Sequence, residues 1–308
     1  MTAGTTIAAA RHLNTRPRRR WLYGLVGLMQ LIWAINYLVA KVALREVPAP
    51  LVGGVRIAMA ALGLLPLYWW RGRDSPPWQP GELRRLVWLG AVGVAVNQTA
   101  FVMGLARTSV AHSAILMGTT PVWVLLLAGL RGLERFTPGR IAGLVAAFGG
   151  LTILSLERPG AGGGPTLAGD LLTLLGAASF AGYVVMAKET THRRYNPIAV
   201  NMVVFVSAAI SLLPLVIWQA WSFPLAQVSL QAWLAVAYMG LFSSMLCYLI
   251  FYYALHHLAA SRLSMFSYLQ PVGATVLGAL LLREHVTAPL VLGGAVILAG
   301  VYITQRSR

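Results

Sequence analysis

Long apolar runs separated by short polar segments constrain what this chain can fold into. Of its 308 residues, 58% are hydrophobic and 10% are charged, whereas soluble domains carry about 25% charged residues. Each run approaches the roughly 20 residues that a helix needs to cross a bilayer, where backbone polar groups must be satisfied within the protein. We therefore predict an all-α integral membrane protein. Its ten predicted transmembrane helices cover residues 22–41, 51–70, 86–106, 109–130, 139–156, 168–188, 197–218, 230–255, 262–282 and 288–304.

The charge distribution agrees with this fold class. A net charge of +16 could indicate nucleic-acid binding, but the basic residues fall in loops between the apolar runs, so we predict the lipid bilayer and no nucleic acid as a partner. Alternate loops hold most of the Lys and Arg residues, beginning with the N-terminal tail, which places both termini in the cytoplasm. The single cysteine, Cys247, lies in an apolar run, and the sequence predicts no metal site and no cofactor.

The chain repeats itself at a shift of 150 residues. Residues 88–153 align without a gap on 238–303, and residues 33–41 align on 180–188 at a slightly smaller shift. Each half thus holds five helices, and because five is odd, the second half must begin on the opposite side of the membrane. We predict two inverted five-helix repeats. The predicted segments are a basic cytoplasmic tail at 1–21, a first repeat at 22–157, a Gly/Pro-rich linker at 158–167, a second repeat at 168–304 and a cytoplasmic tail at 305–308.

Inverted repeats indicate transport, because two similar bundles can open a site at the membrane midplane first to one side and then to the other. An intramembrane enzyme would need a set of catalytic residues, and neither H-E-x-x-H nor G-x-S-x-G is present. A receptor or scaffold would be expected to carry soluble domains or long tails. We therefore predict a transporter of a small-molecule substrate and no enzyme.

Several residues carry a resemblance to a known family. Helix 1 has the pattern W-x-x-N-x-x-x-x-K at Trp33, Asn36 and Lys41, helix 2 carries Arg56, and helix 4 carries Pro121 in TTPVW. Over nearly the whole chain these features resemble the EamA family of the drug/metabolite transporter superfamily. The resemblance implies export of small metabolites across the bacterial inner membrane, with amino acids, including aromatic ones, as the substrates of similar members. It also implies a central cavity walled by helices 1–4 and 6–9, with helices 5 and 10 to the side.

Polar and aromatic side chains within the helices are the candidate substrate contacts, since such groups normally face a bundle interior or a cavity. In helix 1, Trp33, Asn36, Tyr37 and Lys41 share one face, although Lys41 lies near the helix end and could instead extend to the interface. The other predicted substrate-binding residues are Asn97, Gln98, Phe101, His112, Thr119, Trp123, Tyr183, Ser244, Tyr248, Tyr252, Tyr268 and Gln270. The aromatics among them could equally pack in the core, and the amides could pair helices.

Arg56, Pro121 and Pro271 are predicted to have gating or structural roles, because proline kinks helices and a fixed bend serves packing as well as a hinge does. In the second half Tyr183 replaces the asparagine of helix 1, and no arginine matches Arg56. Charge-based recognition is therefore expected to be asymmetric.

The predicted mechanism is alternating access by facilitated diffusion or exchange. We find no carboxylate in the middle of any predicted span, whereas proton-coupled pumps commonly use one. His112 could titrate near neutrality, which leaves proton coupling open, as an alternative together with export of other amphipathic metabolites or drugs. Small residues of helix 5 indicate either a scaffold or a dimer seam, so a monomer and a homodimer both stay open.

Overall fold

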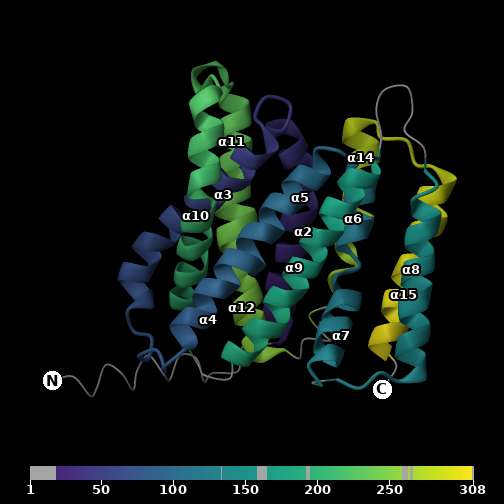
Figure 1. Ribbon diagram of the computed structural model, residues 1–308, viewed down its shortest axis with the longest axis horizontal. Coiled ribbons are helices and arrows are strands. Elements are labelled where there is room, and N and C mark those ends of the chain that lie inside the picture. The colour runs from purple at the N-terminus through teal and green to yellow at the C-terminus, as the bar shows by residue number, and fades with distance from the viewer. Residues whose placement is uncertain are drawn as a thin grey trace.

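A computed structural model describes residues 19–132, 134–157, 165–191, 195–258, 263 and 266–306, which form a bundle of helices with no strand among these residues (Figure 1). The predicted tail at 1–18, the linker residues 158–164 and the end at 307–308 lie outside the described residues. The helices are α2 (Arg19–Ala43), α3 (Ala49–Leu67), η1 (Tyr68–Gly72), α4 (Glu82–Trp88), η2 (Leu89–Val96), α5 (Asn97–Leu105), α6 (Val110–Met117), α7 (Thr120–Leu130), α8 (Pro138–Leu154), α9 (Leu167–Thr191), α10 (Pro197–Ser222), η3 (Leu225–Gln227), α11 (Leu230–Tyr238), η4 (Met239–Leu246), α12 (Cys247–His257), α14 (Leu269–Leu282) and α15 (Ala288–Arg306).

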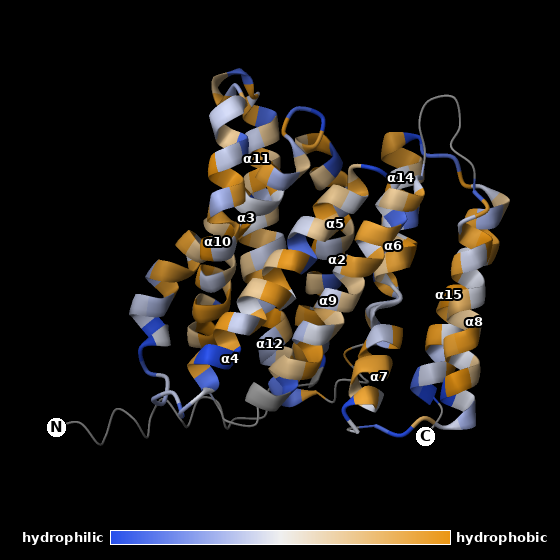
Figure 2. Ribbon diagram, viewed as in Figure 1, coloured by the Kyte–Doolittle hydropathy of each residue, from blue (hydrophilic) through white to orange (hydrophobic). Residues whose placement is uncertain are grey.

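Eight helical segments in the described part of the chain are long and apolar enough to cross a membrane. Two further apolar helices are shorter, with 17 residues in α8 and 14 residues in α14. Hydrophobic residues run along the helices and hydrophilic residues gather toward their ends (Figure 2). The predicted all-helical fold is confirmed for these residues, while the count of ten membrane spans stays a prediction. Within the ninth predicted helix, 262–282, α14 begins at Leu269, and Leu263 and Phe266 before it are also helical.

Two π-helical segments lie at equivalent places in the two halves. The segments η2 and η4 each have eight residues and start 150 residues apart. Each is pressed against a neighbouring helix through a glycine: a Cβ on Gly90 would collide with the Val204 carbonyl of α10, and a Cβ on Gly240 would lie 2.8 Å from the Arg56 carbonyl of α3. The glycines therefore set how closely each π-helical segment approaches the other half.

The end of α2 and the start of α9 meet at the same end of the bundle. Lys41 Nζ, on the last turn of α2, donates to the Thr108 carbonyl at 2.6 Å, and Thr108 Oγ1 donates to Asp170 Oδ1, near the start of α9, at 3.3 Å. These two helices carry the aligned segments 33–41 and 180–188, so the aligned segments run in opposite directions.

A seam of glycines joins α8 to α15, which lie together at one side of the bundle (Figure 1). A Cβ on Gly143 would lie 2.5 Å from the Gly300 carbonyl oxygen, and a Cβ on Gly150 would lie 2.7 Å from the Ile297 nitrogen and 2.8 Å from the Gly293 carbonyl oxygen. Without side chains, the two backbones approach closely enough for extensive van der Waals contact. The small residues that predicted a scaffold or a dimer seam thus lie in a contact within the chain.

The glycine seam can be tested with neighbouring alanine substitutions. We expect Gly150→Ala to destabilise the protein by about 1–3 kcal/mol, because the new methyl group would overpack against the α15 backbone. Gly149→Ala is the matched control, since a Cβ there meets nothing within 4 Å and alanine favours the helix. The measurement is thermal unfolding in detergent. Equal unfolding temperatures for the two variants would contradict a tight seam.

Candidate functional site

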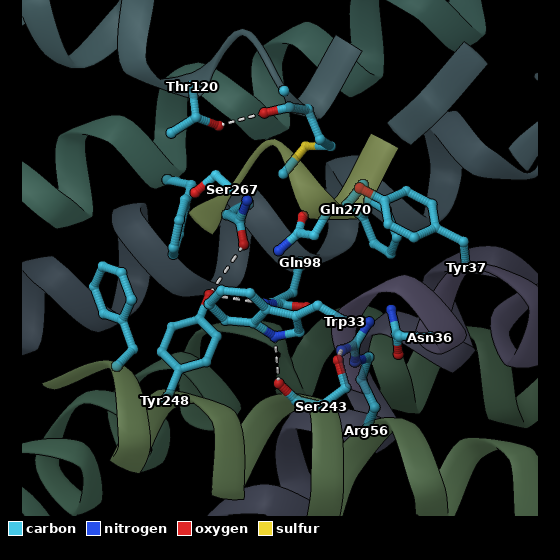
Figure 3. A pocket seen from close by; sticks show the side chains of 16 residues that line it. Trp33, Asn36, Tyr37, Arg56, Gln98, Thr120, Ser243, Tyr248, Ser267 and Gln270 are labelled. Atoms are coloured by element: carbon cyan, nitrogen blue, oxygen red, sulfur yellow. Dashed lines mark hydrogen bonds between the residues drawn. The ribbon is translucent and has the colours of Figure 1, made fainter. Parts of the chain in front are cut away.

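A pocket lies in the centre of the bundle, between helices of the two halves (Figure 3). The first half contributes residues from α2, α3, α5 and the junction of α6 with α7, while the second half contributes residues from α9, η4, α12 and the start of α14. No lining residue comes from α8 or α15. The lining residues are Trp33, Asn36, Tyr37, Arg56, Asn97, Gln98, Phe101, Met117, Gly118, Thr120, Phe180, Ser243, Tyr248, Phe251, Ser267 and Gln270.

A wall of aromatic rings forms one part of the pocket. The ring centroid of Trp33 lies 6.1 Å from that of Phe180 and 6.2 Å from that of Tyr248, and Phe180 lies 5.6 Å from Phe251. The Trp33 indole donates its N–H to the Ser243 carbonyl at 3.0 Å, which fixes the ring between the two halves. Such rings offer a rigid surface against which a flat or apolar part of a ligand can pack.

Amide and hydroxyl groups form a polar network beside this wall. Gln98 Nε2 donates to Tyr248 Oη at 2.8 Å, and Tyr248 Oη donates to Asn97 Oδ1 at 3.3 Å. Asn97 Nδ2 in turn donates to the Gly176 carbonyl of α9 at 2.8 Å. Because each bond crosses between halves, the network positions α5 against both α9 and α12. Buried polar groups linked in this way hold a single arrangement of side chains.

Breaks at the starts of two helices expose further lining groups. Between α6 and α7 the chain turns at Gly118 and Thr119, and Pro121, which has no N–H to donate, lies in the first turn of α7. The Thr120 hydroxyl donates to the Met117 carbonyl at 2.7 Å, which satisfies a carbonyl that the break leaves open. Pro271 has the equivalent place in the first turn of α14. Both prolines therefore begin helices next to the pocket.

The lining follows the internal repeat. Several lining residues form pairs at equivalent positions of the two halves, one residue from each half. The pairs are Trp33 with Phe180 at a shift of 147, and Gln98 with Tyr248, Phe101 with Phe251, Met117 with Ser267 and Thr120 with Gln270 at a shift of 150. Phe180, Phe251, Met117, Ser267 and Thr120 were absent from the residues predicted from the sequence. Carrying each predicted residue across the repeat is the signal that finds Phe180, Phe251 and Thr120.

Arg56 is the charged member of the lining and is 1% exposed. Its Nε and Nη2 donate to Ser244 Oγ at 3.2 and 2.9 Å, and Nη2 also lies 3.3 Å from Ser243 Oγ and 3.4 Å from the Met239 carbonyl oxygen. The sequence predicted a gating or structural role for this residue. That role stays a prediction; the structure brings the Arg56 side chain to the pocket, with two serines of η4 orienting the guanidinium group.

Half of the predicted substrate contacts lie together in this pocket. The predicted residues that line it are Trp33, Asn36, Tyr37, Asn97, Gln98, Phe101, Tyr248 and Gln270. The predicted residues outside its lining are Lys41, His112, Thr119, Trp123, Tyr183, Ser244, Tyr252 and Tyr268.

The residues outside the lining have other contacts. Lys41, near the end of its helix, donates to the Thr108 carbonyl. Thr119 and Trp123 bond to each other along one helix, with Trp123 Nε1 3.2 Å from Thr119 Oγ1. Tyr183 is fully buried behind the lining, with its ring 5.4 Å from that of Tyr248, and Tyr268 bonds to Gln305 of α15.

His112 belongs to a separate buried cluster. Its Nδ1 lies 2.8 Å from Asp170 Oδ1 on α9, and its Nε2 lies 3.6 Å from Glu157 Oε2, just after α8. Thr108 Oγ1 also bonds to Asp170. The sequence places no carboxylate in the middle of a predicted span, and the fold brings these two to one histidine. No group of side chains suited to a metal ion is found in the described part of the chain.

The cluster joins α6, α8 and α9, so we expect His112→Ala to destabilise the protein by about 1–3 kcal/mol because two partly buried carboxylates lose their partner. His285→Ala is the control, since His285 is exposed and such changes alter stability by less than about 0.5 kcal/mol. Chemical or thermal unfolding in detergent measures both. An unchanged stability of His112→Ala, accompanied by loss of activity, would argue against a structural role for the cluster.

Apolar membrane-spanning helices around a buried aromatic and polar pocket define a multi-pass membrane transporter of small molecules. A profile of the EamA-like transporter family matches residues 20–156 and again residues 167–306, and the chain belongs to this family.

This chain is similar to several known proteins over most of their lengths. An uncharacterized transporter of Archaeoglobus fulgidus is 26% identical over 94% of this chain and 100% of its own. An uncharacterized protein of Pseudomonas aeruginosa is 33% identical over 92% and 96%. A protein of Streptantibioticus cattleyicolor named "Probable terminal-alkyne amino-acid exporter" is 29% identical over 83% and 81%. One crystal structure shares the fold, with a TM-score of 0.63 and 20% identity over 91% of this chain and 94% of the other.

Proposed function

We propose that this transporter exports small metabolites, foremost amino acids including aromatic ones, from the cytoplasm across a bacterial inner membrane. The observation that carries the proposal is the central pocket, in which edge-on and tilted aromatic rings adjoin amide and hydroxyl groups. An amino acid with an apolar or aromatic side chain needs both kinds of surface. The relative named as an amino-acid exporter supports this class of substrate.

The proposed architecture is two inverted repeats of five membrane helices, with both termini in the cytoplasm. The two matches to the family profile support the repeat, and the opposite directions of α2 and α9 support the inversion. The glycine seam adds a third argument: Gly143 meets Gly300, which is the repeat equivalent of Gly150, and Gly150 meets Gly293, which is the repeat equivalent of Gly143. Such reciprocal contacts follow from a two-fold axis between the halves.

The proposed mechanism is alternating access by facilitated diffusion or exchange. The breaks before Pro121 and Pro271 and the π-helical segments interrupt helices that line the pocket, and interrupted helices are where a bundle absorbs backbone changes. Several pocket residues of the two halves are paired. An exchange of conformations between the halves would therefore convert a pocket open to one side of the membrane into a similar pocket open to the other side. Export of other amphipathic metabolites or drugs is the alternative for substrate.

Counterflow of labelled phenylalanine into proteoliposomes tests the pocket. We expect saturable counterflow, and we expect Phe180→Ala to raise the half-saturation concentration about 30-fold, since truncating a buried aromatic contact costs roughly 2 kcal/mol of binding. Tyr302→Ala is the matched control, because Tyr302 lies on α15, outside the pocket, and is 46% exposed. Counterflow that Phe180→Ala leaves unchanged would contradict transport through this pocket. No counterflow with any amino acid would move the proposal to other metabolites.

The His112 cluster favours proton coupling as a second candidate mechanism. It places a buried imidazole between two carboxylates from different helices. A facilitator predicts uptake that is unchanged under an imposed pH gradient. If an imposed pH gradient drives uptake against the concentration gradient of the substrate in the wild type but not in His112→Gln, the proton-coupled mechanism replaces the facilitator.

A further inference from the structure

One nitrogen of the Arg56 guanidinium group has no hydrogen-bond partner. Its Nε and Nη2 have hydrogen bonds, but Nη1 is buried and has no hydrogen-bond partner. A buried donor left in this way is costly, and a charged donor more so. The arrangement is held on both sides: Gly240 lets η4 approach the Arg56 backbone, and Ser243 and Ser244 hold the other two nitrogens.

The positive charge of Arg56 also has no counter-charge nearby. Its partners are two hydroxyl groups and one carbonyl oxygen, and no carboxylate of the described residues lies within ion-pair distance of it. None of the residues that line the pocket is acidic. Charged residues inside membrane proteins are normally paired, and they mark ligand pathways when they face a cavity. An anion in the pocket would supply both the missing hydrogen bond and the missing charge.

Asn36 offers the pocket a hydrogen-bond acceptor, whereas Arg56 offers a donor. It is 4% exposed, lines the same pocket, and its Oδ1 accepts no hydrogen bond (Figure 3). An unpartnered acceptor suits a donor such as an ammonium group. The pocket thus offers a cationic donor, a neutral acceptor and the aromatic wall of Trp33, Phe180 and Phe251.

We propose that Arg56 binds the carboxylate of the substrate and is the residue that makes the transporter specific for anionic or zwitterionic molecules. Asn36 receives the substrate's ammonium group when it has one, and the aromatic wall takes the apolar part. The proposal rests on transport through this pocket. It assigns to Arg56 a role in binding in place of the gating or structural role expected from the sequence.

Competition among three related ligands tests this assignment. Phenylalanine has both charges, phenylalaninamide lacks the carboxylate, and 3-phenylpropionate lacks the ammonium group. In wild-type proteoliposomes we expect phenylalaninamide to compete with labelled phenylalanine about 10- to 100-fold more weakly than phenylalanine itself, since it has no carboxylate to accept hydrogen bonds from Arg56. Arg56→Gln should weaken phenylalanine and 3-phenylpropionate by a similar factor and leave phenylalaninamide unchanged. Arg56→Lys should keep part of the preference, because it keeps the charge.

Asn36→Asp serves as a second variant that keeps Arg56 and its serine partners. The added carboxylate would compete with that of the substrate, so we expect the preference for phenylalanine over phenylalaninamide to fall here as well. Equal weakening of all three ligands in Arg56→Gln, or a wild type that does not distinguish phenylalanine from its amide, overturns the proposal while leaving amino-acid transport intact.

A binding measurement separates this proposal from failure of amino-acid transport. If no amino acid is transported, the unfolding temperature of purified wild-type protein is measured with 3-phenylpropionate and with the neutral 3-phenylpropanamide. A rise with the carboxylate alone, absent in both Arg56→Gln and Asn36→Asp, supports the anion site. The same rise with carboxylate and amide, or no rise with either, overturns it.

Discussion

Hydrocarbon cannot hydrogen-bond to a protein, and the rest of this structure depends on that constraint. Backbone groups are satisfied within helices, and polar side chains are satisfied by other parts of the protein. The hydrogen bonds of Gln98, Asn97 and Trp33 therefore cross from one half to the other, where they hold the pocket open and in one shape. Packing without a hydrophobic driving force requires close backbones, which the glycines of α8 and α15 allow. The hydrogen bonds around the pocket and the close contact of α8 with α15 both suit a protein that is surrounded by hydrocarbon.

The two halves have similar sequences, but the first half alone places an arginine, Arg56, in the pocket lining. Five pairs of lining residues follow the repeat, whereas position 204, which aligns with Arg56 when LLPL at 64–67 is placed on LLPL at 212–215, is a valine. Paired lining suits the proposed alternating access, because states open to either side would then present similar walls to the substrate. In the proposed binding mode the single arginine gives the pocket a direction, so a zwitterion would lie in it in one orientation. The sequence led us to expect asymmetric charge-based recognition, and this stays a prediction.

Much of the fold and about half of the pocket could be predicted from the sequence, and the reasons for the remainder are physical. Apolar runs fix the helices, and a shared helical face brings Trp33, Asn36 and Tyr37 to one pocket. Lys41 shares that face but lies eight residues from Trp33, about 12 Å along the axis, which takes it beyond the pocket to the Thr108 carbonyl. His112 joins Asp170 and Glu157 because loops return three helix ends to one place, and a face-by-face pattern contains no such information.

Arg56 has a consequence for the transport cycle that follows from charge alone. In the proposed loaded carrier the substrate's carboxylate neutralises the guanidinium group, whereas an empty carrier that closes around the pocket would bury the charge with only serine hydroxyls and a carbonyl beside it. Closing while empty is then less favourable than closing while loaded, because an unpaired buried charge is costly. A carrier of this kind returns more readily with a second anion than without one. Exchange is therefore favoured over net uniport for the same reason that anionic or zwitterionic substrates are favoured over neutral ones.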